Sequence, residues 1–375
     1  MLLANRRYTQ EAIETAEQVA NEVNVRHAKW LVSMKYLLDQ SNVDNLLSLQ
    51  GRYCEDVIFS EDERITRNQR ILLECEQAKV VERREQVKAR QNTHKRVVVD
   101  VTHHAEHMMI EKLLNTPIDK LFNGIPNFDH LASFAYSPSL SFSKLSTLTT
   151  LSHQLSSSIL DLVTNPKFCE RIGKSSKSAT DANTKLIAPK MWQHMIVTAN
   201  VTRMRLQDAN FKEPDAGILI GVLRTVGQFL ASNHFTHTFE DALVEMMLKY
   251  REQDMREEYY ACAEVVANMS FLPKIIFELE GQLAKRVLES MDWPANAMFI
   301  KNAVIEDIDN VPVEERSIAG AALAQGRAFS IYDGLQHSNA FVEKHKPYWF
   351  AQVQMPGTSL KDIQARMPGR LTLSM

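Results

Sequence analysis

Residues 217–230 read GILIGVLRTVGQFL and place one permanently charged side chain inside an apolar segment. The apolar residues recur at helical spacing, which predicts an α-helix. On this helix the neighbours of Arg224, namely Val222, Leu223 and Val226, are expected to face the core. A guanidinium group in such a position is partly desolvated and needs an anionic partner. The stretch therefore predicts a helical core that contains an ion pair.

The N-terminal third of the chain also favours helices. Residues 1–116 contain a single glycine, Gly51, and no proline, so residues that break helices are almost absent. An apolar stripe predicts an amphipathic helix, and its members are Ile13, Ala16, Val19, Ala20 and Val23. A capping box at residues 60–63 begins a second helical unit. Only residues 96–101 form a short β-branched run, so we expect an all-α protein.

The length of the chain and the positions of its glycine and proline residues predict three structural parts. The 375 residues divide into an N-terminal helical, coiled-coil-like domain (1–112), a multi-helical domain (113–310) and a C-terminal helical extension packed on it (311–375). Helices from residue 190 onward should break at Pro214, Thr238, Pro273 and Pro294. We expect residues 232–238 to form a loop that ends in Thr238 as a helix N-cap, and residues 318–331 to form one more apolar helix.

Several segments resemble one known family. Residues 217–230 resemble the GLLHDIG helix of the HDOD family, the HD-related output domain of bacterial signalling proteins. Residues 191–199, MWQHMIVTA, resemble its WxHS helix, and residues 283–294, LAKRVLESMDWP, resemble a third helix and its stop. Residues 142–148 and 159–168 are similar to the two short helices that open the domain. The resemblance implies a multi-helical HD-like fold over about residues 113–310.

The same resemblance implies that catalysis has been lost. In metal-dependent relatives the His and Asp of this helix hold a divalent cation that activates water. Arg224 and Thr225 stand at these two positions, and a guanidinium group has no lone pair to offer a metal. Glu280 stands where the family has a further His, and residues 301–304, KNAV, stand where metal-binding relatives have a His pair. The resemblance implies a non-catalytic regulatory module without a cofactor, acting through signalling proteins or a small ligand.

Candidates for the vestigial site, or for a ligand site in its place, are His194, Arg224, Thr225, His234 and Glu280. Two partners are open for Arg224: the carboxylate of Glu280, or an external phosphate or nucleotide that its guanidinium group would grip bidentately. We favour the internal pair. Two other functions are weighed beside the regulatory module: a phosphohydrolase with a metal site rebuilt from His194, His234 and nearby acids, and a structural scaffold without any ligand.

His103 and His107 lie four residues apart and would share one helix face, as two metal ligands do. No third ligand or supporting partner is visible in the sequence, so we interpret them as exposed histidines. Residues 79–96 hold seven basic and two acidic residues with no aromatic residue among them. That composition favours a solvated helix face over a nucleic-acid surface.

Bulk properties exclude other classes of protein. The formal net charge is −3, and no apolar run approaches the roughly 20 residues of a membrane span. The four cysteines have no CxxC spacing, and no Gly-rich phosphate loop, GxSxG or HExxH motif is present. We expect a cytoplasmic protein that does not bind membranes, with N-terminal helices that dock on the rest of the chain or form a homodimer.

Overall fold

The structure is a computed structural model that describes residues 2–4, 8–33, 37, 77–121, 187–366 except 268 and 292, and 368. All regular secondary structure in these residues is helical, which confirms the all-α class. The predicted capping box and the segments at 142–148 and 159–168 lie outside the described residues. The described helices are α1 (Gln10–Val32), α5 (Gln77–Asn115), α6 (Ile118–Leu121), α11 (Ile187–Asp208), α12 (Ala216–Glu252), α13 (Arg256–Cys262), α14 (Leu272–Glu289), α15 (Met298–Ile308), α16 (Ile318–His337), the 3₁₀ turn η3 (Glu343–His345), α17 (Lys346–Gln352) and α18 (Gly357–Ala365).

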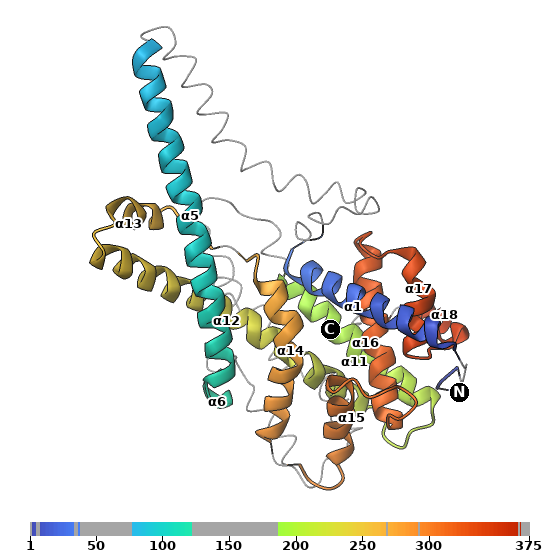
Figure 1. Ribbon diagram of the computed structural model, residues 1–375. Coiled ribbons are helices and arrows are strands. Elements are labelled where there is room, and N and C mark those ends of the chain that lie inside the picture. The colour runs from blue at the N-terminus through green and yellow to red at the C-terminus, as the bar shows by residue number, and fades with distance from the viewer. Residues whose placement is uncertain are drawn as a thin grey trace, which may run out of the picture.

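Helix α11 lies at the centre of the body, between α12 and α16 (Figure 1). Small residues let these helices approach one another closely. A Cβ atom on Gly221 of α12 would lie 2.6 Å from the Cα of Ala199 on α11, and a Cβ on Gly326 of α16 would collide with Thr202. Only glycine fits at such contacts, because a methyl group would force the helices apart.

Five of the described helices are followed by a residue in the left-handed conformation. Asn210, Asp254, Asn310 and Asn339 have φ values of 51°, 54°, 52° and 52° and follow α11, α12, α15 and α16, and Gln354 with a φ of 46° follows α17. Asn and Asp tolerate this conformation better than other non-glycine residues, so they stop a helix as glycine commonly does. Proline contributes at the other end: Pro273 occupies the first turn of α14, where its missing N–H costs nothing.

The predicted break at Thr238 is wrong. Helix α12 runs without interruption from Ala216 to Glu252, so residues 232–238 form no loop and Thr238 is not an N-cap. Its hydroxyl donates to the carbonyl oxygen of His234 at 2.8 Å, within the helix. Phe235 and Phe239 are buried in the core on either side of it. Their burial outweighs the weak local preference of Ser, Asn and Thr for turns.

Helix α1 packs on α14 and α17. Docking on the rest of the chain was one of the two outcomes predicted for the N-terminal helices. Helix α1 begins at the N-cap Thr9, whose hydroxyl accepts from the N–H of Ala12 at 3.3 Å. At its other end Trp30 is buried, and its Nε1–H donates to Ser338 Oγ at 2.7 Å. The predicted apolar stripe is buried except for Ile13, which is 41% exposed.

Helix α5 is 39 residues long and packs on α12, α13 and α14. Its buried side recurs every four residues, at Val97, Val101, Ala105, Met109 and Leu113. The β-branched run at 96–101 is therefore helical. The helix crosses residue 112, where we expected a domain boundary, and one hydrophobic cluster includes residues from Val19 to Ile363.

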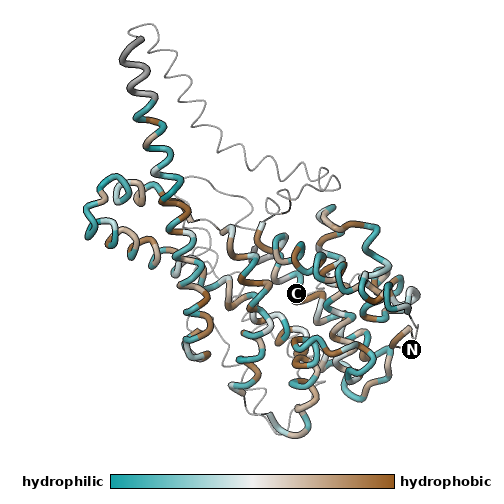
Figure 2. The backbone as a smooth tube through the Cα atoms, viewed as in Figure 1, coloured by the Kyte–Doolittle hydropathy of each residue, from teal (hydrophilic) through white to brown (hydrophobic). Residues whose placement is uncertain are grey.

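Part of α5 projects away from the body, with α13 and the end of α12 beside its middle (Figure 1). Figure 2 shows the projecting part as mainly hydrophilic, whereas apolar residues gather where α5 meets the other helices. We call α5, α13 and residues 240–252 of α12 the arm. None of the helices in the described residues is long and apolar enough to cross a lipid bilayer.

Candidate functional site

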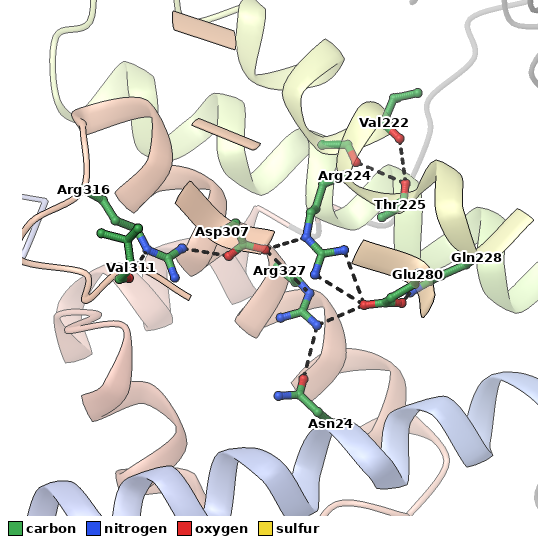
Figure 3. Close-up of polar contacts among 11 residues, drawn as sticks. Asn24, Val222, Arg224, Thr225, Gln228, Glu280, Asp307, Val311, Arg316 and Arg327 are labelled. Carbon is green, nitrogen blue, oxygen red and sulfur yellow. Dashed lines mark hydrogen bonds and ion pairs between the residues drawn. The ribbon is translucent and has the colours of Figure 1, made fainter. Parts of the chain in front are cut away.

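Arg224 lies in the first half of α12 with only 5% of its side chain exposed. Its Nε–H donates to Asp307 Oδ2 at 2.6 Å, and its Nη1 and Nη2 groups lie 3.4 Å from Glu280 Oε1 (Figure 3). The predicted internal pair with Glu280 is confirmed. The shorter bond, however, goes to Asp307, which the sequence analysis did not single out.

Further groups complete the site. Asp307 accepts a second hydrogen bond, from Arg316 Nη1 at 2.7 Å. Arg327 Nη2 lies 3.2 Å from Glu280 Oε1, and the Nε2–H of Gln228 donates to Glu280 Oε2 at 2.6 Å. We call Arg224, Glu280, Asp307, Arg316 and Arg327 the charge cluster (Figure 3).

The helices bring these side chains together from distant parts of the sequence. A Cβ atom on Gly227 would collide with the backbone carbonyl oxygen of Glu280, so this glycine lets α12 lie directly against α14. Asp307 is near the end of α15, Arg316 follows in the connection to α16, and Arg327 is in the middle of α16. The glycine at position 227 thus lets Arg224 and Gln228 of α12 come close to Glu280 of α14.

Mutual attraction keeps the cluster ionised. Burial alone would raise the pKa values of Glu280 and Asp307, but the neighbouring Arg224 and Arg327 lower both, and Arg316 contributes further at Asp307. Burial would lower the pKa of Arg224, but the carboxylates of Asp307 and Glu280 raise it. Burial and repulsion by Arg224 lower the pKa of Arg327. Three guanidinium groups and two carboxylates therefore face one another inside the protein.

His194 is next to the cluster but belongs to a different contact. Its ring is buried, and its Nδ1 lies 2.8 Å from Ser330 Oγ, whose own hydrogen is donated to the carbonyl oxygen of His194. Nδ1 is therefore the protonated nitrogen. Nε2 is buried and has no hydrogen-bond partner among the described residues. The ring of His27 on α1 packs against it at 4.4 Å between centroids.

Both histidines are held neutral. Burial lowers the pKa of His27 to about 3, and Arg327 and Lys190 contribute to the decrease while Glu280 opposes it. Burial, His27 and the two arginines Arg327 and Arg224 lower the pKa of His194 well below its ordinary value. A neutral His194 can act only as a hydrogen-bonding group at neutral pH, not as a cation.

The other two candidates do not join the cluster. The hydroxyl of Thr225 donates back to its own helix, to the carbonyl oxygens of Gly221 at 3.1 Å and Val222 at 3.0 Å. The Nε2 of His234 lies 2.8 Å from the carbonyl oxygen of Leu121 on α6. The structure therefore unites Arg224 and Glu280, places His194 beside them, and leaves Thr225 and His234 elsewhere.

His103 and His107 are exposed on α5, as interpreted from the sequence. The histidine between them, His104, pairs with Glu245 Oε2 at 2.8 Å. Within the described residues, no group of three or more His, Cys, Asp or Glu side chains is arranged to hold a metal ion. Cys262 is buried, and burial raises the pKa of its thiol, so it behaves as a small apolar side chain.

A cleft of about 1670 Å³ lies beneath α1, and the charge cluster lines it. Residues of α14, α16, α17 and the segment that follows α15 form the other walls. Arg327 also lines the cleft and is the most exposed member of the charge cluster, with 20% of its side chain exposed against 5% for Arg224 and 4% for Asp307. The buried charge cluster thus forms part of the wall of a cleft that is open to solvent.

Asp307, Arg316 and Arg327 were missed by the sequence analysis. The signal that identified Arg224, a lone charge in an apolar helix, is also present at Arg327, within AALAQGRAFSIY at residues 321–332. Asp307 directly follows Glu306 in AVIEDI at residues 303–308, so it is not a lone charge. Applied along the whole chain, this signal finds Arg327 but not Asp307, and it does not say which charges meet.

Comparison with known proteins gives no match to a described family, to a curated protein or to a solved structure. The resemblance to the HDOD family stays a prediction from its motifs. What the protein does must be inferred from the charge cluster and the cleft themselves.

Proposed function

We propose that the protein is a non-catalytic regulatory module of the HDOD type, which acts in bacterial signalling through protein partners or a small ligand. The observation that carries the proposal is the position of Arg224. Its guanidinium group pairs with Glu280 and Asp307, and it stands at a position where the resemblance puts a metal ligand.

Electrostatics support a loss of metal-dependent hydrolysis. Both carboxylates are already paired with arginines: Asp307 with Arg224 at 2.6 Å and Arg316 at 2.7 Å, and Glu280 with Arg327 at 3.2 Å and Arg224 at 3.4 Å. A divalent cation would have to displace these groups and approach three positive charges in a poorly solvated place. Arginine keeps its proton at any ordinary pH, so the repulsion cannot be relieved by deprotonation.

The test is chemical. In protein purified without chelator, we expect elemental analysis to find no stoichiometric Mn, Fe, Ni or Zn, and phosphodiesterase and nucleotidase assays to read background. One tightly held metal ion per chain, or hydrolysis that follows added metal, would favour the rival phosphohydrolase.

The arm supports a role for protein partners. Val244 and Leu248 lie four residues apart on one face of α12 and are 55% and 50% exposed, and Tyr260 on α13 is 69% exposed. Apolar groups gathered on a projecting part commonly mark an interaction surface. We propose that the arm binds a signalling protein or a second copy of the chain.

Changing both Val244 and Leu248 to Asp should remove binding without unfolding the body, because both side chains are exposed. The matched control is Ile318→Asp, which is also 50% exposed but lies at the start of α16. Co-purification from the native cell, with solution mass from light scattering, measures the outcome. A double variant that keeps every partner and the same mass would contradict the role of the arm.

A further inference from the structure

The charge cluster carries one positive charge more than it balances. Within the described part of the chain, Arg224, Arg316 and Arg327 pair with two carboxylates, those of Glu280 and Asp307. An excess charge in a poorly solvated place is unfavourable unless an anion or water compensates it. The cleft above the cluster is where a compensating anion can enter.

Arg327 holds this excess, since its contacts are the loosest. Its Nη2 lies 3.2 Å from Glu280 Oε1 and 3.4 Å from Asn24 Oδ1, and its Nε lies 4.0 Å from Asp307 Oδ2. Arg224 and Arg316, in contrast, each make bonds shorter than 2.8 Å. Among the described residues, the Nη1 group of Arg327 has no hydrogen-bond partner, so a donor edge is available to a carboxylate or phosphate.

His27 gives a second, independent sign of a ligand. It lines the same cleft, three residues after Asn24 on α1, and is only 4% exposed. Its Nε2 is buried without a hydrogen-bond partner among the described residues. Buried polar atoms are rarely left unpaired, so this nitrogen lacks a polar partner that the described side chains do not supply.

The outer walls have the opposite charge. Glu17 on α1, Glu278 on α14 and Glu314 before α16 line the cleft and are exposed, and no lysine is among the described lining residues. These carboxylates repel a ligand with several negative charges, such as a nucleotide. They attract a positive group on a ligand whose negative group reaches Arg327.

We infer that the cleft binds a short peptide with free ends, whose carboxylate pairs with Arg327 and whose ammonium group faces Glu17, Glu278 and Glu314. The cleft, at about 1670 Å³, exceeds the roughly 300 to 1,000 Å³ of common small-molecule pockets, so a single amino acid would fill little of it. The inference rests on the proposed function in one respect, namely that the cleft binds its ligand without hydrolysing it.

The first experiment measures thermal shift and equilibrium dialysis on the full chain with random-sequence tripeptides in three forms. We expect tripeptides with free ends to bind and to raise the melting temperature. Amidation of the C-terminus should abolish the shift, because the carboxylate that pairs with Arg327 is gone. Acetylation of the N-terminus should weaken it, and AMP and a single free amino acid should bind more weakly still.

Two variants separate recognition from stability. Arg327→Met should weaken binding by more than about 30-fold, since it removes the partner of the carboxylate. Changing both Glu17 and Glu278 to Gln should weaken the binding of tripeptides with free ends by about two- to fivefold. The same change should strengthen the binding of N-acetylated tripeptides. A damaged fold would weaken both forms, so the opposite signs identify a direct effect of charge.

Tighter binding of AMP or inorganic phosphate than of tripeptides would overturn the inference, as would unchanged affinity in Arg327→Met. Absence of binding by every peptide form at millimolar concentration would overturn it as well. These results leave the proposed function standing, because that depends on metal content and hydrolysis. Conversely, bound metal with peptide hydrolysis would refute the non-catalytic function while the peptide still binds.

Discussion

Arg224 and Arg327 belong to the same charge cluster, but the lengths of their polar contacts differ. Arg224 bonds to Asp307 at 2.6 Å and contacts Glu280 as well, whereas the shortest polar contact of Arg327 with a described residue is 3.2 Å, to Glu280. Removing a well-bonded partner from a buried pair costs much more than removing a loosely held one. The two arginines should therefore differ in what they contribute to stability.

Arg224→Met should lower the free energy of unfolding by about 3 kcal/mol, because Glu280 and Asp307 lose their shared partner. Arg327→Met should cost less than about 1 kcal/mol, since it leaves two arginines against two carboxylates. Urea denaturation of both variants measures the difference. Lys285→Met, which breaks a surface pair with Asp309 at 3.2 Å, is a control for loss of charge alone. Equal costs for the two arginines would refute this ranking.

The buried histidines make stability depend on pH. The pKa of His27 is about 3 in the folded protein against 6.5 as its ordinary value, and the pKa of His194 is lowered in the same direction. Below pH 6.5 the unfolded chain binds protons that the folded protein does not. Stability should thus fall as the pH falls from 6.5, by about 1.4 kcal/mol per pH unit for each histidine.

His194→Asn should reduce this slope between pH 6 and 5 by about half, and His103→Gln, at an exposed position of α5, should leave it unchanged. Glu280 and Asp307 do not interfere in this window. Their pKa values are lowered, so their contribution is fully present above their ordinary values of 4.5 and 3.8 and is lost only at lower pH. Urea denaturation at several pH values gives the slopes.

At the scale of elements, the glycines of α12 set the distance between helices. A Cβ on Gly221 would lie 2.6 Å from a backbone atom of α11, and one on Gly227 would collide with the backbone of α14. Gly357 at the start of α18 has no neighbouring atom within 4 Å of such a Cβ. The three positions therefore make a matched set.

Gly221→Ala and Gly227→Ala should each lower the free energy of unfolding by about 1 to 3 kcal/mol or more, because backbone atoms cannot move aside as side chains can. Gly357→Ala should be neutral or stabilise by up to about 1 kcal/mol, owing to the better helix propensity of alanine. Thermal unfolding by circular dichroism compares the three. Tolerance of alanine at both 221 and 227 would mean that α12 packs less closely than described.

Local sequence predicted much of the helical structure but not all of its limits. The stripe of α1, the breaks at Pro214, Pro273 and Pro294, and the helix from residue 318 were predicted correctly, because spacing and proline act locally. The break at Thr238 was wrong, since its outcome depended on the burial of Phe235 and Phe239. Tertiary packing is invisible in a short window of sequence.

The same limit applies to the site. That Arg224 needs a buried carboxylate followed from its apolar surroundings, and Glu280 followed from its place in the resemblance. Asp307 lies 83 residues from Arg224, and only the packing of α15 beside α12 brings the two together. The need for a partner was predictable from the sequence, whereas the identity of the nearest partner was not.

At the scale of the whole molecule, α1 closes one side of the cleft and covers apolar surface of α14 and α17. Deleting residues 1–33 should expose that surface, because α1 itself contributes buried apolar side chains such as Val23, Trp30 and Leu31. We expect a fall of at least about 10 °C in melting temperature and increased binding of a hydrophobic dye. Unchanged melting and unchanged solution mass would mean that α1 does not dock in solution.

The unbroken course of α12 joins two regions that would otherwise be mechanically separate. Arg224 and Leu248 are on the same rod, about 36 Å apart at 1.5 Å per residue. Close glycine contacts hold helix α12 near Arg224. A small rotation of the helix at that point therefore becomes a larger displacement of its far end, in the arm. A tilt of only about 3° would carry Leu248 roughly 2 Å sideways. A break in the helix at Thr238 would have removed this mechanical coupling between Arg224 and the arm.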